Sequence, residues 1–303
     1  MSAVMTTPDS AFLSVKQVAA YLQLNEKKVY ALVNEGKIPA TKVTGKWMFP
    51  RELVDRWMMD SALGGLLTVR LVIGGSDDPL LYRTVTAFAH EVNALAQVRF
   101  TPTGTRLGLD LLQANRVDES ALHWGPLKES HTRHPALLRQ HARYRNWVLI
   151  RAFSREQGLM VRPDVLRRAG DPETLMQGGY RWVQRQAGAG AQRFLLEMRK
   201  NAAAGEALNI SATALSEREA AAAIVLDQAD VATGPRAAAT EAGLGFIPFG
   251  VEGFDLALPR NIWFRRLFQE LLNRLQSGEC RRLADMLGGY DFSQSGELIW
   301  GED

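Results

Sequence analysis

Three times along the chain, an apolar, β-branched stretch runs through a small polar loop into a helical pattern. The loops are Gly74-Gly75-Ser76 after TVRLVI, Thr103-Gly104-Thr105 after QVRFTP, and residues 186–190 (QAGAG) after RWVQR. Strands that alternate with helices form a largely parallel sheet covered by helices, and ligand sites lie at the carboxyl ends of its strands. The repeated unit therefore predicts an α/β fold with its site at that edge.

The third loop has the features of an anion cradle. Gly188 and Gly190 allow a tight turn and close backbone approach, so that the first N–H groups of the following helix can point at an anion. Arg185 and Arg193 flank the loop. Each can assist an anion or form an ordinary ion pair, and glycine-rich turns of this kind also serve close packing alone. The loop itself leaves both interpretations open.

The positive charge of the chain is concentrated near its start. The 303 residues carry a net charge of +3, and residues 12–60 contain eight Lys and Arg against five acids, so 8 − 5 = +3 accounts for the whole excess. The chain lacks an apolar run of about 18 residues and an export signal, so we expect a cytoplasmic protein. The single Cys280 agrees with a reducing compartment and is expected to pack in an amphipathic helix.

The basic segment has the pattern of two short helices. Ser14 and Gln17 form a capping box that starts a helix over residues 15–22. After a short turn, Asn25 can cap a second helix that stops at Gly36. Two such helices joined by a tight turn predict a helix-turn-helix.

A hairpin and a third helix follow. KIPATKVTGKWMF alternates around Thr44-Gly45, which predicts a two-stranded wing, and Pro50 opens the next helix in its first turn. The whole segment LSVKQVAAYLQLNEKKVYALVNEGKIPATKVTGKWMFPRELVDRW resembles the excisionase and MerR-like winged helix-turn-helix family over residues 12–60.

This resemblance implies a partner, double-stranded DNA. The second helix would enter the major groove and the wing would contact phosphates, whereas Trp47 and Trp57 would belong to the core. The residues that it places on DNA are Asn25, Lys27, Lys28 and Tyr30 of the second helix and Lys42 and Lys46 of the wing.

The rest of the chain resembles a second family. Six segments carry the resemblance in order: IGGSDDPLL, REQGLMVRP, RWVQRQAGAGAQRFLLE, AAAAIVLDQADVATGPRAAA, LGFIPFGVEGFDLALPR and LGGYDFSQSGEL. They are similar to the periplasmic-binding-protein-like ligand-binding domain, in the branch related to molybdate-binding proteins, that is fused to a helix-turn-helix in bacterial regulators. The implied fold class is α/β, a two-lobed type 2 domain over residues 68–303, with crossings between lobes near 150–160 and 245–255.

The same resemblance implies a ligand site in the cleft between the lobes. Hydroxyls and helix N–H groups suit a dehydrated oxyanion. The resemblance to molybdate-binding proteins implies molybdate or tungstate as the ligand, and a different small polar metabolite is the alternative. Asp77 stands where the family often has His, and Asp77 and Asp78 would repel an anion unless they cap the helix or face outward. We expect them to be N-cap and first-turn residues of the helix and not direct ligands. The expected ligand residues are Ser76 and Thr105 of the first lobe and Arg185, Gln186, Gly188, Ala189, Arg193 and Thr233 of the second.

Other chemistry has little support in the sequence. Four histidines, at positions 123, 131, 134 and 141, lack the cysteines and clustered carboxylates of a zinc site, so we expect surface histidines and no metal. No nucleophile elbow, Ser/His/Asp set or phosphate loop is present, so we predict that the protein is not an enzyme.

The predicted organisation is a disordered N-terminus (1–11), a winged helix-turn-helix (12–60), a glycine-containing linker (61–67) and the two-lobed domain (68–303). It favours a ligand-responsive, DNA-binding transcription regulator that acts as a homodimer. One alternative is a cytoplasmic anion-binding or delivery protein whose N-terminal module makes protein contacts. A recombination accessory factor of excisionase type is another, although it would leave most of the chain without a role.

Overall fold

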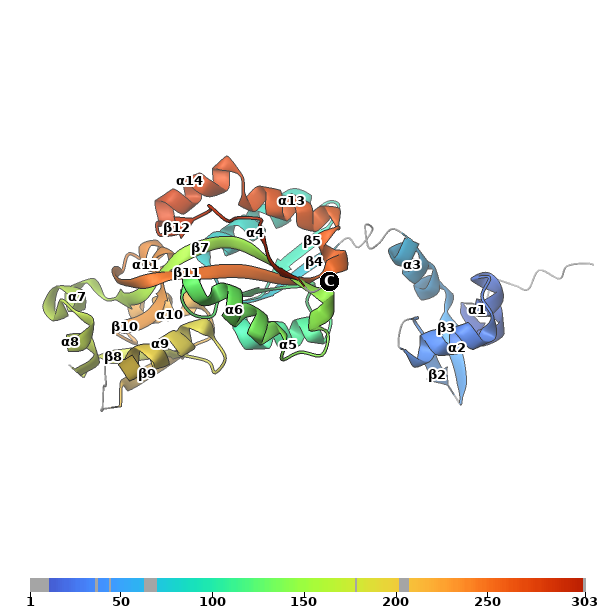
Figure 1. The fold of residues 1–303 in the computed structure, drawn as a ribbon, viewed down its shortest axis with the longest axis horizontal. Helices are drawn as coiled ribbons and strands as arrows, with labels where there is room; N and C mark the ends of the chain where they lie inside the picture. Colours follow the sequence, from blue (N-terminus) through green and yellow to red (C-terminus); the bar gives the residue numbers. More distant parts are fainter. Residues whose placement is uncertain are drawn as a thin grey trace, which may run out of the picture. The chain divides into compact units, whose positions relative to one another are not determined.

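The computed structural model describes residues 11–35, 38–43, 45–62, 70–177, 179–201 and 207–301. It divides into two compact units, Met1–Thr68 and Val69–Asp303 (Figure 1). Apart from Ala11, the predicted disordered N-terminus lies outside the described residues, as do Gly36, Thr44 and most of the predicted linker. The last helix of the small unit reaches Ala62, two residues into that linker.

The small unit has the predicted helices and wing. The Ser14 hydroxyl accepts a hydrogen bond from the Gln17 backbone N–H (3.4 Å), and the Ser14 N–H donates to Gln17 Oε1 (2.8 Å), so the capping box is confirmed. The elements are β1 (Phe12–Ser14), α1 (Val15–Tyr21), α2 (Glu26–Asn34), β2 (Thr41–Val43), β3 (Lys46–Pro50) and α3 (Arg51–Ala62).

Strand β1 was not predicted. It pairs with β3, and the three strands form an antiparallel sheet in the order β1-β3-β2. Pro50 was expected in the first turn of a helix; it is instead the last residue of β3, paired with Phe12, and α3 begins one residue later. Val18, Val29 and Phe49 are fully buried in the core, and Trp47 and Trp57 pack against it as expected.

The large unit is built on one ten-stranded sheet with β5-β4-β6-β11-β7-β10-β8-β9 as its main path (Figure 1). Strands β4, β5 and β6 are parallel to one another, as are β8, β9 and β10. The strands are β4 (Arg70–Gly75), β5 (Gln97–Phe100), β6 (Glu119–Leu122), β7 (Trp147–Val161), β8 (Arg181–Arg185), β9 (Asn209–Ala214), β10 (Val231–Pro235), β11 (Gly245–Pro259), β12 (Tyr290–Asp291) and β13 (Leu298–Gly301).

Helices connect these strands and cover the sheet. They are α4 (Pro79–Val92), α5 (Thr105–Gln113), α6 (Leu127–Leu138), the 3-10 turn η1 (Tyr144–Asn146), α7 (Pro163–Ala169), α8 (Pro172–Gln177), α9 (Gly190–Asn201), α10 (Glu217–Val225), α11 (Arg236–Glu241), α12 (Arg260–Trp263), α13 (Arg266–Leu275) and α14 (Gly278–Leu287). No helix in the described part of the chain combines the length and the apolar character needed to span a bilayer.

Two long antiparallel strands divide this unit into lobes. Strands β7 and β11 have 15 residues each and pair along nearly their whole length. The first lobe lies on the side of β4, β5 and β6, with α12 to α14, and the second on the side of β8, β9 and β10 (Figure 1). The predicted α/β, two-lobed fold class is confirmed, and both predicted crossings fall within β7 and β11.

Each lobe has its own hydrophobic core. In the first lobe, α4, α13 and α14 pack against the sheet, and Cys280 is buried among them with its sulfur 3.5 Å from the Thr84 hydroxyl. In the second, two clusters lie around β10, one with the alanines of α10 and α11 and one with Leu195 and Met198 of α9. The lobes are thus separately packed and share only the crossing strands and the surfaces between them.

Candidate ligand site between the lobes and nucleic-acid interface

The predicted loops of the first lobe meet at the carboxyl ends of their strands. The hydroxyls of Ser76 and Thr105 are 2.8 Å apart, and Thr105 Oγ1 donates to the His123 carbonyl (3.1 Å). Both side chains are at most 1% exposed. The structure therefore brings the two predicted ligand residues together, but their hydroxyls bond to each other.

The glycine loop of the second lobe rests directly on the first lobe. Gly188 lies at φ +85°, and its carbonyl accepts a hydrogen bond from the Arg106 N–H (3.2 Å). A Cβ on Gly190 would lie 2.5 Å from His123 Cε1. Gln186 Nε2 donates to the carbonyls of Thr103 (3.3 Å) and Leu215 (2.9 Å). In this closed arrangement, the loop's glycines serve close packing between the lobes.

The N–H and hydroxyl groups expected to hold an anion from the second lobe also have partners within the protein. The Ala189 N–H donates to the Gln186 carbonyl (3.2 Å), which closes the turn. Thr233 is buried on β10 and its hydroxyl donates to the Ala191 carbonyl (3.0 Å). These bonds would have to open, or the ligand would have to bind beside them, for either residue to contact an anion.

A carboxylate of the protein itself lies where the sequence suggested an external anion. Glu217, the first residue of α10, is 1% exposed and forms an ion pair with Arg185 of its own lobe. Its other oxygen is 3.3 Å from His123 Nε2 in the first lobe and 3.7 Å from Arg155 Nη2 on β7. Of the two roles predicted for Arg185, assisting a bound anion or forming an ordinary ion pair, the structure shows the ion pair.

The ion pairs continue through the crossing strands. Glu252 on β11 bonds to His123 Nδ1 (2.8 Å) and to Arg155 Nε (2.8 Å). Arg155 also donates to Asp78 Oδ2 (2.9 Å), which accepts a hydrogen bond from the Tyr290 hydroxyl (3.0 Å). Arg155, Arg185 and His123 thus face three carboxyl groups, Asp78, Glu217 and Glu252, all of them buried. Each carboxyl group of the cluster therefore has a basic partner within the protein.

The pKa shifts in this cluster follow from burial and pairing. Burial alone would lower the pKa of His123, but the negative charge of Glu252 and the hydrogen bonds to Glu217 and Glu252 together outweigh it, and the net shift is upward. Burial would raise the pKa of Glu217, yet Arg185 and His123 hold it at about 2. Burial raises the pKa of Asp78, and Arg155 only partly offsets this rise. His123 and Glu217 therefore stabilise each other's charged forms across the lobes.

A second carboxylate joins the lobes beside this cluster. Asp77 of the first lobe accepts hydrogen bonds from the Arg218 backbone N–H (3.0 Å) and from its guanidinium Nη2 (2.9 Å) in the first turn of α10. Asp78, not Asp77, caps α4 by accepting from the Leu81 N–H (2.9 Å). The expectation for Asp78 is correct, whereas Asp77 places its charge at a helix start of the opposite lobe, where a bound anion would also be stabilised.

An open groove lies next to these buried contacts. Its volume is about 670 Å³, and none of the described residues that line it is Asp or Glu. The guanidinium groups of Arg106 and Arg193 lie over the ring of Trp124, 5.4 and 5.3 Å from its centroid, and Arg193 also pairs with Glu197. Five of the predicted ligand residues line this groove: Arg185, Gln186, Gly188, Ala189 and Arg193.

The sequence analysis missed the charged residues of the crossing strands. Arg151 and Arg155 interrupt the buried run WVLIRAFSREQGLMV, and Glu252 and Asp255 interrupt LGFIPFGVEGFDLALP. A charge inside an otherwise apolar strand was the available signal, because a buried charge requires a partner. The partner of each charge could not be read from the strands themselves.

The prediction of surface histidines is wrong for His123 and His134, which are at most 1% exposed. His134 Nδ1 lies 2.6 Å from Asp255 Oδ2, and its Nε2 accepts a hydrogen bond from the Trp124 N–H (2.9 Å). Asp255 also pairs with Arg151. Because the two imidazoles satisfy buried carboxylates on β11, their role here is in the packing of the crossing strands.

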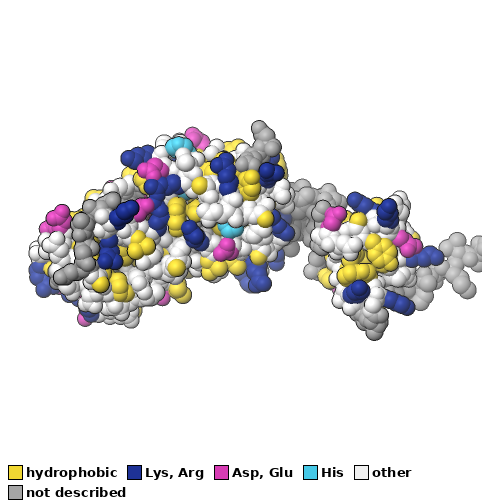
Figure 2. All heavy atoms as spheres, turned by 60° about the horizontal axis from the view of Figure 1, so that its bottom comes forward, with side chains coloured by type: hydrophobic (Ala, Val, Ile, Leu, Met, Phe, Trp, Pro, Cys, Tyr) yellow, Lys and Arg dark blue, Asp and Glu magenta, His cyan; other side chains and the backbone are white. Residues whose placement is uncertain are grey.

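The predicted DNA-contacting residues lie on α2 and the wing. Lys27, Lys28 and Tyr30 are exposed, as are Lys42 and Lys46, and the ammonium of Lys42 lies 5.6 Å from the Trp47 ring. Figure 2 shows several Lys and Arg side chains projecting from the small unit. Asn25 is exposed too, but its side chain accepts a hydrogen bond from the Lys28 N–H (2.7 Å) and so caps α2.

The folds of the two units define the class of protein: a helix-turn-helix module joined to a two-lobed ligand-binding domain. The chain belongs to the PBP superfamily, whose domain model matches residues 86–276, and residues 12–61 match the model of a helix-turn-helix domain. No curated protein matches the sequence.

Solved structures show the same fold at low sequence identity. The tungstate ABC transporter from Geobacter sulfurreducens is 13% identical, with 71% of this chain and 97% of that one covered and a TM-score of 0.50. A mutant of OxyR from Corynebacterium glutamicum is 12% identical, with 90% of each chain covered and a TM-score of 0.51. At these identities the likeness concerns the fold alone.

Proposed function

We propose that this protein is a ligand-responsive, DNA-binding regulator of transcription. The observation that carries the proposal is the union, in one chain, of a helix-turn-helix module with exposed basic residues and a two-lobed domain whose lobes are joined by ion pairs across the cleft. The first part can bind DNA, and the second can change its arrangement when a ligand replaces those ion pairs. The proposed function includes no catalytic step, and it places the protein in the cytoplasm as a homodimer.

We propose further that the ligand is a small oxyanion, with molybdate and tungstate as the candidates. The groove beside the cleft supports this choice, because Arg106 and Arg193 flank it and none of the described residues that line it carries a negative charge. The fold likeness to the tungstate ABC transporter agrees with it. An anion that reached Arg185 would take the position of the Glu217 carboxylate, and Arg185 would keep an anionic partner.

The switch follows from this competition. Without ligand, Glu217 and Asp77 hold the lobes in the closed arrangement; with ligand, Glu217 is released and α10 can move relative to the first lobe. The ligand shifts the population only by its difference in affinity for the two arrangements, about 1–3 kcal/mol in typical allosteric proteins. In a dimer such a shift would alter the spacing of the two recognition helices and with it the affinity for paired half-sites.

The proposal is tested by titrating the purified full-length protein with DNA fragments from upstream of its own gene, with and without molybdate, tungstate and sulfate. We expect salt-dependent binding to one fragment and a change of about five- to 150-fold in affinity with one oxyanion. If an oxyanion binds but no fragment does, the protein is an anion-binding or delivery protein instead. If DNA binds but none of the three anions affects either affinity or melting temperature, the choice of ligand is wrong.

A further inference from the structure

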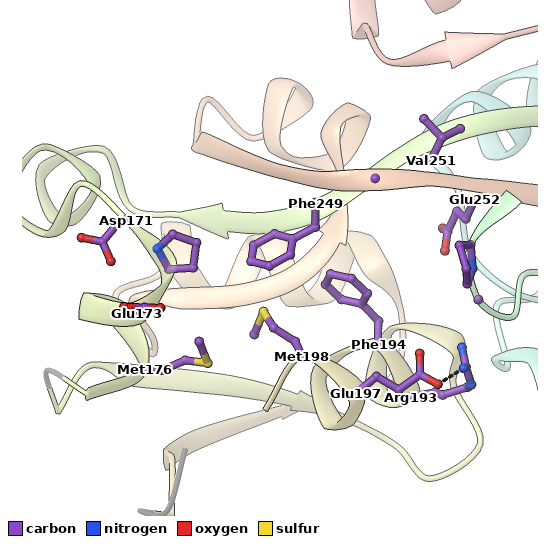
Figure 3. Close-up of a pocket in the computed structure, with 14 residues that line it drawn as sticks. Asp171, Glu173, Met176, Arg193, Phe194, Glu197, Met198, Phe249, Val251 and Glu252 are labelled. Carbon is purple, nitrogen blue, oxygen red and sulfur yellow. Dashed lines mark hydrogen bonds and ion pairs between the residues drawn. The ribbon is translucent and has the colours of Figure 1, made fainter. Parts of the chain in front are cut away.

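A second cavity lies along the crossing strand β11 and shares one lining residue, Arg193, with the groove of the cleft. Its volume is about 650 Å³, within the range of about 300–1,000 Å³ that is usual for small-molecule sites. Gly125 and Pro126 of the first lobe form one wall, helices α8 and α9 of the second lobe form others, and residues 249–252 of β11 line the remainder. We call it the hinge pocket (Figure 3).

A β-bulge places an aromatic ring in the hinge pocket. On β11, Pro248 pairs with Gly158 and Gly250 pairs with Gln157, so Phe249 is the extra residue and has no partner on β7. Bulges re-aim side chains in this way and are frequent next to binding sites. Phe249 remains 42% exposed, although its ring packs edge-on against Phe194 of α9 with the centroids 5.7 Å apart.

The middle of the hinge pocket is apolar and adaptable. Figure 3 shows Met176 and Met198 on the same side of the cavity as Phe194, with Phe249 facing them. Methionine side chains fill irregular gaps and make favourable contacts with aromatic rings. Phe249 is exposed, Met176 and Phe194 are partly exposed, and Met198 is buried beneath them. Because exposed apolar surface is costly in water, covering the first three with an apolar body would be favourable.

The charges of the hinge pocket are arranged asymmetrically. Glu197 pairs with Arg193 and Arg133, and Glu252 pairs with Arg155 and His123, so both of these carboxylates are compensated. Asp171 and Glu173 lie together at the outer end, beyond Met176, and within the described residues neither has a salt bridge (Figure 3). Asp171 accepts hydrogen bonds from Thr174, which lowers its pKa, so it is negatively charged. That end is complementary to a cation.

We propose that the hinge pocket is a second ligand site, for an elongated apolar molecule that carries a protonated amine at one end. The apolar body lies on Phe249, Phe194 and the two methionines, and the ammonium group lies at Asp171 and Glu173. This ligand has the opposite charge to the oxyanion proposed for the cleft. The two cavities share Arg193, but the five side chains on which this proposal depends do not line the groove of the cleft: Asp171, Glu173, Met176, Met198 and Phe249. Binding at the hinge pocket can therefore be tested separately from the oxyanion and from DNA.

The experiment compares three probes with one apolar body and different charges: 4-phenylbutylammonium, 4-phenylbutanol and 4-phenylbutyrate. Binding to the full-length protein is measured by calorimetry and thermal shift at about neutral pH. We expect the ammonium probe to bind most tightly and the carboxylate probe most weakly. Equal affinity for all three, tighter binding of the carboxylate probe, or no binding of the ammonium probe at millimolar concentration overturns the proposal.

Variants locate the bound probe. Phe249→Ala removes an exposed ring and should lower the affinity for the ammonium probe about tenfold. The control Phe264→Ala removes a 75% exposed ring in the first lobe and should leave that affinity unchanged. The double variant Asp171→Asn with Glu173→Gln should bind the ammonium probe about tenfold more weakly than wild type. Its affinity for the alcohol probe should fall less than twofold. Asp285→Asn, an exposed carboxylate on α14, is the matched control. Unchanged binding in both pocket variants, with melting temperatures near wild type, contradicts the assignment.

Discussion

The carboxylate of Asp77 binds the first turn of α10 through the backbone N–H and the guanidinium of Arg218. The two residues belong to opposite lobes and are 141 positions apart in the sequence. Asp77 is buried and Arg218 is only 25% exposed, so the pair is shielded from solvent on one side. With Glu217, it makes the start of α10 the main electrostatic contact between the lobes.

The Asp77–Arg218 pair should show measurable coupling. In a double-mutant cycle with Asp77→Asn and Arg218→Gln, we expect an interaction free energy of about 0.5–3 kcal/mol, because the two side chains are in direct contact. The cycle is measured by urea denaturation of the full chain. Glu241→Gln with Arg83→Gln, an ion pair between α4 and the end of α11 in which Arg83 is half-exposed, should give less than about 1 kcal/mol. Equal coupling for the two pairs would contradict a special role for the Asp77 contact.

Replacing Glu217 by Gln should unbalance the buried cluster. Arg185 and His123 would lose their shared carboxylate, and removal of one partner from a buried ion pair costs about 3–5 kcal/mol. An added oxyanion could then supply the negative charge that Arg185 and His123 have lost, so molybdate, tungstate or sulfate should raise the melting temperature of Glu217→Gln more than that of wild type. Glu219→Gln, on the exposed side of the same helix, is the control. A variant as stable as wild type and indifferent to all three anions would refute the competition mechanism.

Because of Glu119, the free energy of unfolding should fall as the pH rises from about 4.5 to about 8. The side chain is fully buried, neither of its oxygens has a hydrogen-bond partner among the described residues, and burial together with Asp118 raises its pKa to about 8. Because the folded pKa lies above the unfolded value of 4.5, the stabilising contribution is complete below about pH 4.5 and is lost as the pH rises through 8. The slope is about 1.4 kcal/mol per pH unit within that window.

Glu119→Gln tests this pH dependence. The variant should flatten the decline in the free energy of unfolding between about pH 5 and 8, measured by urea denaturation at a series of pH values. Glu279→Gln, an exposed carboxylate on α14, should keep the wild-type slope. A parallel decline in Glu119→Gln and wild type would show that Glu119 does not take up the proton.

Asp255→Asn should be strongly destabilising. Asp255 is fully buried and pairs with both Arg151 and His134, so the substitution leaves a buried guanidinium without its countercharge. We expect a loss of about 3–5 kcal/mol in the free energy of unfolding. The same substitution at the exposed Asp285 should change stability by less than about 0.5 kcal/mol. Similar values for the two variants would mean that the Arg151 cluster contributes little.

Lys27→Ala with Lys28→Ala should weaken DNA binding in a salt-dependent way. If each lysine neutralises one phosphate, the slope of log K against log salt should become shallower by about 0.9 per lysine. Lys128→Ala with Lys200→Ala removes the same charge from exposed positions in the large unit and should leave the slope unchanged. Fluorescence anisotropy over a salt series provides the measurement, and equal slopes in the two double variants would remove α2 from the interface.

Local pattern was sufficient to predict most elements of the fold. The capping box at Ser14, the cap at Asn25 and the three strand-loop-helix units depend on residues close in sequence, and the structure has each of them. Strand β1 was missed because three residues without alternation carry no periodic signal; its formation depends on pairing with β3. The position of Pro50 was decided by the same pairing.

The amino-acid sequence by itself determined that small hydroxyl and glycine loops end the strands of an α/β domain, because strand and helix periodicity and turn chemistry act over a few residues. Only the tertiary structure decided which charges meet there. Glu217 reaches His123, and Asp77 reaches Arg218, through folding of segments far apart in the chain. In a low-dielectric cleft every buried charge requires a partner, and that partner is set by the three-dimensional arrangement of the lobes and not by any local pattern.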